Sequence, residues 1–162
     1  MSRTTIPLPF DNLDYQIIRC LNEDARMSAV DLEKVTKANQ RTIRKRIQRL
    51  IDMGALRLRA VVEPKVFGFG ISVDIFVTLD GADEADVIEK LGEMPPVTYI
   101  ATGQNAEELS LECRFQDMEA MEAFFKHDLA SLEGVKVKGY ALVPRIVKNI
   151  DDWLPPAEIF RD

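Results

Sequence analysis

Cysteine, histidine and tryptophan are scarce in this 162-residue chain, which contains two, one and one of them. Cys20 and Cys113 lie far apart and fit no CxxC or zinc-ligand spacing, so we interpret them as buried thiols in a reducing compartment. No Ser/His/Asp set, metal-ligand cluster or phosphate-binding loop accompanies the single histidine, His127. The sequence therefore predicts no catalytic residues, no metal ion and no cofactor.

Long hydrophobic runs are also missing. No apolar run approaches the roughly 20 residues that a membrane-spanning helix needs, and the N-terminal stretch MSRTTIPLPFDN lacks the apolar region of a signal peptide. With charged residues at 30% and a net charge of −6, the composition is that of a soluble globular chain. We expect a cytoplasmic protein with no membrane partner.

Acidic residues are absent from one stretch that is rich in bases. Asn39 to Leu50, NQRTIRKRIQRL, holds five Lys and Arg and no Asp or Glu. Residues 1–60 carry 12 bases against 7 acids, a net charge of +5, whereas residues 61–162 carry 9 against 20, a net charge of −11. This asymmetry indicates two parts with different partners, of which the basic part suits a polyanion.

The basic half predicts three short helices. Apolar spacing predicts a helix over Asn12–Glu23, and Ser28 begins a second helix that stops near Lys37. Asn39 begins a third helix that ends near Met53 before Gly54. Three short helices of which the last is basic are typical of a helix-turn-helix.

The third helix has one apolar side and one basic side. Ile43, Ile47 and Leu50 share the first, while Arg41 and Lys45 lie opposite. A solvated face usually mixes charges of both signs, but here no acid offsets the repulsion. We therefore predict that this face meets the phosphates and base edges of DNA.

A short strand is predicted after the third helix. In ALRLRAVV, residues 55–62, apolar residues alternate with Arg57 and Arg59. Beside a helix-turn-helix, such a strand serves as a wing or as a linker, and the sequence leaves both interpretations open.

The acidic half alternates between strand and helix patterns. The predicted elements are, in order, a strand over Ile71–Leu79, a helix over Asp83–Met94, strands over Val97–Thr102 and Leu109–Phe115, a helix over Asp117–Leu132 and a strand over Val135–Val143. The order βαββαβ is that of a ferredoxin-like sandwich, in which two helices cover one face of an antiparallel sheet.

The other sheet face needs a partner if it is apolar. We predict that it carries Phe76, Tyr99, Tyr140 and Leu142, and that it is buried in a symmetric dimer. The fold class is thus α+β. The domains are a three-helix (winged) helix-turn-helix over residues 1–60, a linker over 61–70, a ferredoxin-like βαββαβ sandwich over 71–150 and a tail over 151–162.

Four segments in order along the chain resemble one known family. They are LDYQIIRCLNEDAR (Leu13–Arg26), MSAVDLEKV (Met27–Val35), NQRTIRKRIQRLIDMGAL (Asn39–Leu56) and VVEPKVFGFG (Val61–Gly70). Together they resemble the Lrp/AsnC (feast/famine) transcriptional regulators, over roughly residues 11–147. The resemblance implies regulation at promoters, double-stranded DNA as partner, dimers that can assemble into tetramers or octamers, and a small effector, usually an amino acid.

The chain departs from the family at two places. Lys37 stands where the family usually has Gly in the turn before the recognition helix, and this turn favours glycine. The ligand loop, TGQNAEEL, lacks the usual Asp unless Glu107 or Glu108 substitutes for it. We therefore expect common amino acids to bind weakly or not at all, and DNA binding to need none of them.

Two groups of residues are the predicted sites. For DNA they are Asn39, Gln40, Arg41, Thr42, Arg44, Lys45 and Arg49. Arg46 and Arg49 are also candidates for intramolecular partners. For the effector they are Thr102, Gly103, Gln104 and Asn105, with a plain hairpin turn as the alternative.

Other functions stay open at this point. Some heme-pathway decarboxylases share this combination of folds, but the sequence lacks a catalytic set, so we predict that the chain is not an enzyme. A module that binds only protein leaves the basic helix unexplained. A nonspecific, chromatin-organising DNA-binding protein differs from a regulator in its ratio of specific to nonspecific affinity.

Overall fold

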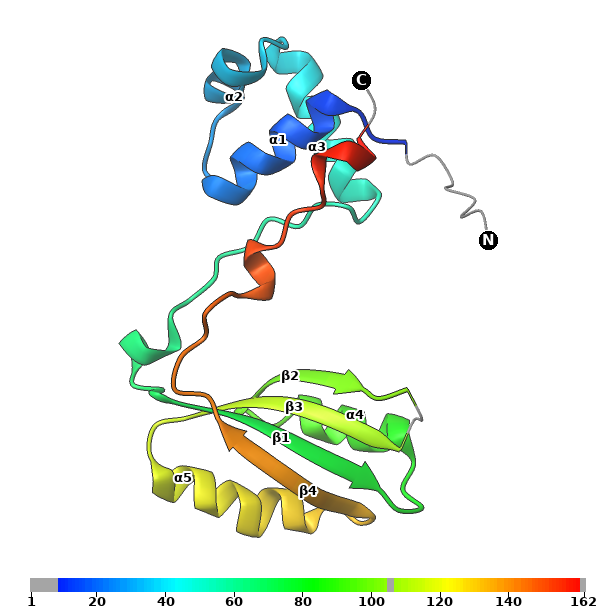
Figure 1. The fold of residues 1–162 in the computed structure, drawn as a ribbon, viewed down its shortest axis with the longest axis vertical. Helices are drawn as coiled ribbons and strands as arrows, with labels where there is room; N and C mark the ends of the chain where they lie inside the picture. Colours follow the sequence, from blue (N-terminus) through cyan, green and yellow to red (C-terminus); the bar gives the residue numbers. More distant parts are fainter. Residues whose placement is uncertain (1–8, 105–106, 161–162) are drawn as a thin grey trace. The chain divides into compact units, whose positions relative to one another are not determined.

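The structure, a computed structural model, describes residues 9–104 and 107–160. The chain forms two compact units (Figure 1). The helical unit comprises Met1–Val61 together with Lys148–Asp162, and the sheet unit comprises Val62–Val147, in each case as far as the chain is described. The C-terminal residues therefore belong to the same unit as the predicted helix-turn-helix.

The helical unit contains the three predicted helices, α1 (Asn12–Glu23), α2 (Ala29–Thr36) and α3 (Gln40–Asp52). Each begins after a side chain that accepts a hydrogen bond from a free backbone N–H of the first turn: Asp11, Ser28 and Asn39. Their apolar faces meet in a buried core of Ile17, Cys20, Leu21, Leu32, Ile43 and Leu50. This confirms the prediction of a three-helix domain.

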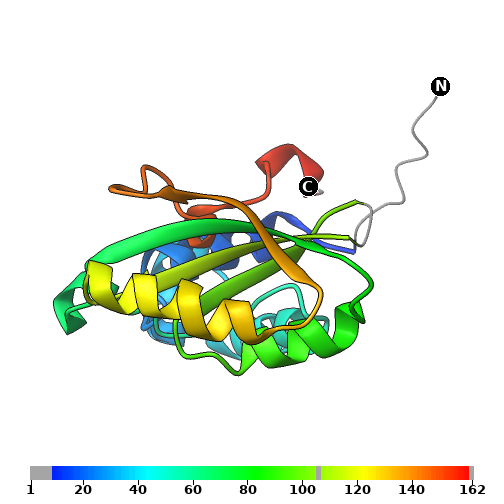
Figure 2. The same ribbon diagram turned by 90° about the horizontal axis from the view of Figure 1, so that it is seen from below.

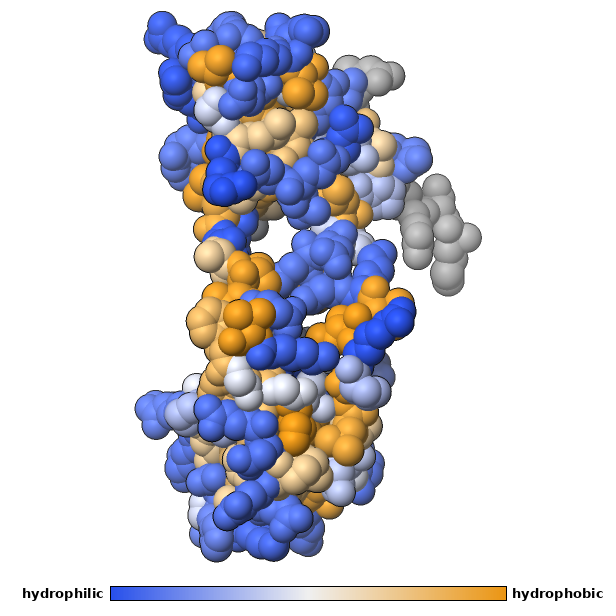
Figure 3. Space-filling view, turned by 90° about the vertical axis from the view of Figure 1, so that its left-hand side faces the viewer, coloured by the Kyte–Doolittle hydropathy of each residue, from blue (hydrophilic) through white to orange (hydrophobic). Residues whose placement is uncertain are grey.

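The predicted strand over residues 55–62 is absent. In the described chain no residue between α3 and β1 is part of a strand, and only one 3-10 turn, Pro64–Phe67, interrupts the irregular backbone. Alternating side chains cannot make a strand without a neighbouring strand to pair with its backbone. Apolar side chains of this connection remain exposed, among them Val62, Val66 and Phe67, and Figure 3 shows hydrophobic surface in this region.

The sheet unit has the predicted βαββαβ order. Its strands β1 (Ile71–Leu79), β2 (Val97–Thr102), β3 (Glu108–Phe115) and β4 (Val135–Leu142) form one antiparallel sheet in the order β2-β3-β1-β4. Helices α4 (Glu84–Gly92) and α5 (Met118–Ala123) lie on the same face of the sheet (Figure 2). Neither of these two helices covers the other face, which is called the open face below. The fold is thus the predicted ferredoxin-like sandwich.

The core of the sheet unit lies between the sheet and its helices. Alternate residues of β1 and β3 point into it, from Val73 to Leu79 and from Leu109 to Phe115. Cys113 is fully buried there, and burial raises the pKa of its thiol to about 12. Cys20 is buried in the other core, so the interpretation of both cysteines as buried thiols is confirmed.

The second helix of the sheet unit differs from the prediction after Ala123. A turn of π-helix spans Phe124–Asp128, and the Leu129 N–H donates to the Phe124 carbonyl, five residues back. A 3-10 turn, Leu129–Ser131, follows. Phe124 is buried at this turn, and Phe125 is partly buried against the same core.

A bulge in β4 corrects the predicted open face. Phe76 pairs with Gly139 but Val77 pairs with Val137, so Lys138 is an extra residue that reverses the alternation. Beyond it, Tyr140 pairs with Ile75 and Leu142 pairs with Val73, and both partners point toward the helices. The prediction that Tyr140 and Leu142 lie on the open face is therefore wrong.

Two predicted aromatic residues do lie on the open face. Phe76 alternates with the buried residues of β1, and Tyr99 pairs with Glu112, which faces away from the core. They are 47% and 50% exposed. The open face therefore has fewer large apolar residues than the sequence predicts, with Phe76 on the inner strand β1 and Tyr99 on the edge strand β2.

Candidate DNA-binding interface

Helix α3 presents its N-terminal half as an exposed edge of the helical unit. Ile43 and Leu50 anchor its apolar side in the core with no exposed surface. Asn39, the residue before the helix, is exposed and accepts hydrogen bonds from the backbone N–H and hydroxyl of Thr42, at 2.9 and 3.1 Å. The cap fixes where the helix begins and therefore which side chains face outward.

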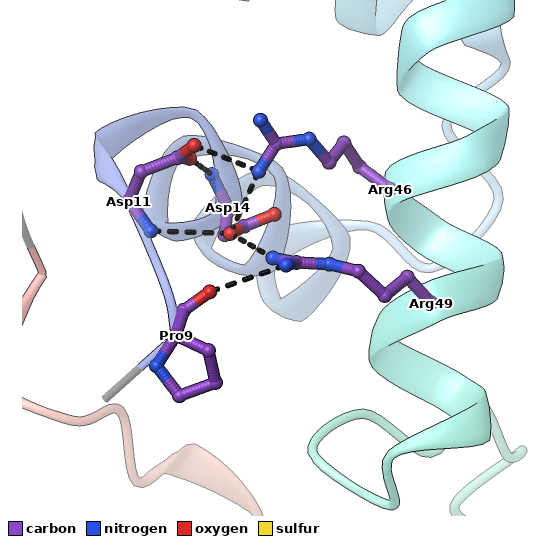
Figure 4. Close-up of polar contacts among 5 residues, drawn as sticks. All are labelled: Pro9, Asp11, Asp14, Arg46 and Arg49. Carbon is purple, nitrogen blue, oxygen red and sulfur yellow. Dashed lines mark hydrogen bonds and ion pairs between the residues drawn. The ribbon is translucent and has the colours of Figure 1, made fainter. Parts of the chain in front are cut away.

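Two of the five bases of α3 belong to an internal ion-pair network (Figure 4). Asp14 of α1 has no exposed surface, and its Oδ2 lies 3.0 Å from Arg46 Nη1 and 2.5 Å from Arg49 Nη2. Arg46 also pairs with Asp11 at 2.7 Å, and Arg49 donates to the Pro9 carbonyl at 3.2 Å. This network joins α3 to the start of α1.

The network also lowers the pKa of Asp11. Partial burial works to raise the pKa of Asp11, but the Asp14 N–H and the Arg46 guanidinium outweigh it and lower that pKa. Asp11 and Asp14 are therefore the counter-charges of Arg46 and Arg49. The structure thus gives Arg49 the intramolecular partners that the sequence analysis offers as one of its two roles.

Gln40 is also engaged within the unit. Its amide donates to Glu33 Oε2 of α2 at 2.9 Å, and its oxygen accepts a long hydrogen bond of 3.5 Å from Arg44. Gln40 therefore helps to hold the turn between α2 and α3. One N–H of its amide has no partner among these contacts.

Three bases of α3 remain as an exposed, uncompensated group. Arg41, Arg44 and Lys45 are exposed, and none forms an ion pair within residues 9–104 and 107–160. They lie on one side of the first two turns of α3, away from Ile43. Such a row of positive side chains on a capped, rigid helix is suited to the phosphates and base edges of a DNA groove.

Comparison with known proteins supports this assignment of the helical unit. Residues 10–51 match the model of the AsnC-type helix-turn-helix domain. The HTH-type transcriptional regulator PH0140 of Pyrococcus horikoshii is 27% identical over 139 residues, which cover 85% of this chain and 88% of that protein.

Solved structures share the fold of both units. A transcriptional regulator of Neisseria meningitidis, NMB0573, in complex with L-Met, superposes with a TM-score of 0.78 at 24% identity, covering 86% of this chain and 92% of that one. E. coli AsnC superposes with a TM-score of 0.74 at 20% identity, covering 87% and 97%. The helical unit therefore matches an AsnC-type helix-turn-helix domain, and the chain shares the fold of these solved structures.

The AsnC-type helix-turn-helix and the similar regulators indicate that the chain acts in the regulation of transcription. The relatives found by comparison are transcriptional regulators, not decarboxylases. Within the described part of the chain, no group of three or more His, Cys, Asp or Glu could hold a metal ion. Among the helices that the structure describes, none is long and apolar enough to cross a membrane.

The candidate effector loop of this chain connects β2 to β3. Thr102 and Gly103 border a cavity of about 240 Å³ at the open side of the sheet. The other residues that line it are Phe76, Val77, Glu108, Leu109, Ser110 and Lys138. Glu108 Oε1 and Lys138 Nζ, 2.5 Å apart, form an ion pair at this cavity. A small zwitterion could place its ammonium near Glu108 and its carboxylate near Lys138.

The backbone of Gly103 is engaged within the hairpin. Its N–H donates to the Glu108 carbonyl at 2.6 Å and closes the hairpin, so it is not available to a ligand carboxylate. A Cβ at Gly103 would lie 3.0 Å from the Glu108 Cβ, which explains why a glycine stands there. Gln104 is exposed in the turn, and Asn105 lies outside the described residues.

Proposed function

We propose that this regulator binds specific DNA sites through the exposed N-terminal half of α3, with Arg41, Arg44 and Lys45 as its main contacts. The observation that carries the proposal is the division of the five bases of α3 into two groups. Arg46 and Arg49 have carboxylate partners, whereas these three have none in the described structure. A polyanion supplies the missing counter-charge.

The three contacts differ in what they can read. Arginine binds guanine with two parallel hydrogen bonds, whereas lysine acts as a point charge. We assign base contacts to Arg41 and Arg44 and a phosphate contact to Lys45. Asn39 and Thr42 act chiefly as the cap, and Gln40 can offer DNA the amide N–H that Glu33 does not use.

The test is DNA affinity in the double variant Arg41→Ala, Lys45→Ala. We expect binding to weaken by roughly 30-fold or more, or about 2 kcal/mol. The dependence of affinity on salt should also become shallower, because fewer counterions are released. Fluorescence anisotropy with a duplex selected by the wild-type chain measures both quantities.

The matched control is Lys90→Ala, Lys126→Ala. Both are exposed lysines of the sheet unit, each paired with an acid one helical turn earlier, and the change in net charge is the same. The control variant should bind DNA as the wild type does. If both double variants lost the same DNA affinity, net charge and not α3 would account for binding, and the proposal would fail.

We also propose a homodimer that buries the open sheet face of the sheet unit. Phe76 and Tyr99 are half exposed there, next to the small residues Ala101, Gly139 and Ala141, which allow close approach. A symmetric dimer presents two α3 helices to two half-sites. The cytoplasm is the compartment where such a regulator meets DNA.

The effector proposal concerns the cavity beside Glu108 and Lys138. A zwitterionic amino acid fits their charges, but it must displace an existing ion pair, so the net gain is small. We therefore expect common amino acids to bind weakly or not at all, and DNA binding to proceed without them. The L-Met complex of NMB0573 makes methionine the first ligand to titrate.

Calorimetric titration with the twenty amino acids measures this directly. A Kd of about 1 mM or weaker corresponds to roughly −4 kcal/mol and would agree with the expectation. Lys138→Met removes one partner of the ion pair and leaves Gly103 and its hairpin intact. Tight binding that this variant abolishes would show instead that the cavity is an efficient amino-acid sensor.

A further inference from the structure

The C-terminal segment, residues 148–160, folds back onto the helical unit. The Phe160 ring lies 5.0 Å from the ring of Tyr15 and 6.2 Å from that of Phe10. Asp151 pairs with Arg59 at 2.6 Å. The segment is thus attached at two separate points, one aromatic and one ionic.

The aromatic attachment continues toward α3. Phe10 packs against the core of the helical unit, and the Arg49 guanidinium lies 6.0 Å from its ring centroid. Arg49 also binds the Pro9 carbonyl and Asp14. The residues just before α1 are therefore in contact with Phe160 and with α3.

We propose that Phe160 is a positioning residue for the recognition helix, acting through Phe10 and Arg49. The aromatic contact restricts the start of α1, and Arg49 transmits that restraint to α3. This inference rests on the proposed function of α3. It gives the C-terminal segment a part in DNA binding, although the segment itself touches no DNA.

The segment also connects the two units. It follows β4 along the chain, so it is a second covalent connection beside residues 55–70. Arg59 and Asp151 lie on the two connections and join them.

The first test is independent of DNA. Trp153 is the single tryptophan, it lies in this segment, and it is 62% exposed, so its fluorescence reports on the segment. In the full chain, Phe160→Ala should lower the steady-state anisotropy of Trp153, because the segment gains motion. Ile159→Ala, at the neighbouring, 42% exposed position, is the control and should leave the anisotropy unchanged. Equal anisotropy in all three proteins would overturn the attachment.

The second test measures DNA binding by the same variants. With a selected duplex, Phe160→Ala should weaken binding about fivefold, whereas Phe160→Tyr and Ile159→Ala should bind like the wild type. Affinity for a random duplex should change little, because the phosphate-binding cations remain. If part of the Phe160→Ala protein were misfolded, the apparent affinities for the selected and the random duplex would fall together. Phe160→Ala should add no loss in a Phe10→Ala background.

Two outcomes separate this inference from the proposal for α3. If Arg41→Ala, Lys45→Ala impairs binding but Phe160→Ala does not, the role of Phe160 is refuted and that of α3 stands. If the Arg41, Lys45 variant binds normally, the proposal for α3 fails. The anisotropy of Trp153 still decides whether the segment is attached.

Discussion

At the residue scale, identical side chains of α3 differ through their partners. Arg46 pairs with Asp11 and Asp14. Arg41, on the same helix, pairs with no carboxylate in the described structure. Asp14 is the key residue, because it is fully buried and accepts from two guanidiniums. Its Oδ1 has no hydrogen-bond partner within the described chain, so the two arginines are its main compensation.

Replacing Asp14 should therefore destabilise the helical unit. Asp14→Ala leaves Arg46 and Arg49 partly buried without their shared carboxylate. We expect a loss of about 2–3 kcal/mol, less than for a fully buried pair because both arginines reach solvent. The urea midpoint measures it. Asp24→Ala, which removes an exposed pair with Arg26, is the control and should change the midpoint little. Equal midpoints for Asp14→Ala and the wild type would contradict this assignment.

At the scale of elements, the turn between α2 and α3 carries a strained residue. Lys37 has φ +61°, the left-handed conformation that favours glycine, and is the only described non-glycine residue with positive φ. Its N–H donates to the Glu33 carbonyl and ends α2. Lys37 therefore adopts the left-handed conformation itself, and the turn does not take a different shape to avoid it. The fold keeps the geometry that a glycine would adopt more easily.

Lys37→Gly should stabilise the chain by about 0.5–1 kcal/mol, because the relief of backbone strain exceeds the added freedom of the unfolded state. Lys34→Gly, inside α2, is the matched comparison. It should destabilise by about 1 kcal/mol, because glycine is a poor helix residue. Thermal unfolding of both variants measures the difference. A lower melting temperature for Lys37→Gly would show that the Lys37 side chain contributes more than the strain costs.

The helix caps and most buried faces of the elements could be predicted, because they depend on residues near in sequence. Asp11, Ser28 and Asn39 mark helix starts by their side chains alone. The bulge at Lys138 could not, because the alternation around Gly139 fits either register and only the pairing with β1 decides it. The ion pairs of Asp14 could not be predicted either, because its partners on α3 are 32 and 35 residues away in the sequence.

At the scale of the whole molecule, the proposed dimer determines how DNA is read. Light scattering at micromolar concentration should find a dimer or a larger oligomer. Phe76→Glu, Tyr99→Glu should shift it toward the monomer, because both charges would be buried at the proposed interface. Tyr140→Glu serves as the control, since Tyr140 lies on the helix side of β4 beside Phe125. A stable wild-type monomer would contradict the dimer.

The central claim is that the exposed face of α3 reads DNA sequence, and selection from a random duplex library tests it most directly. The wild-type chain should enrich two inverted half-sites, with centres roughly 10 bp or a multiple apart. Arg41→Lys should change the preferred base at one position of each half-site and leave the others as they were, because lysine cannot form the two-bonded contact of arginine with guanine. Identical selected sites for Arg41→Lys, Arg44→Lys and the wild type would contradict the assignment of α3 as the reading helix.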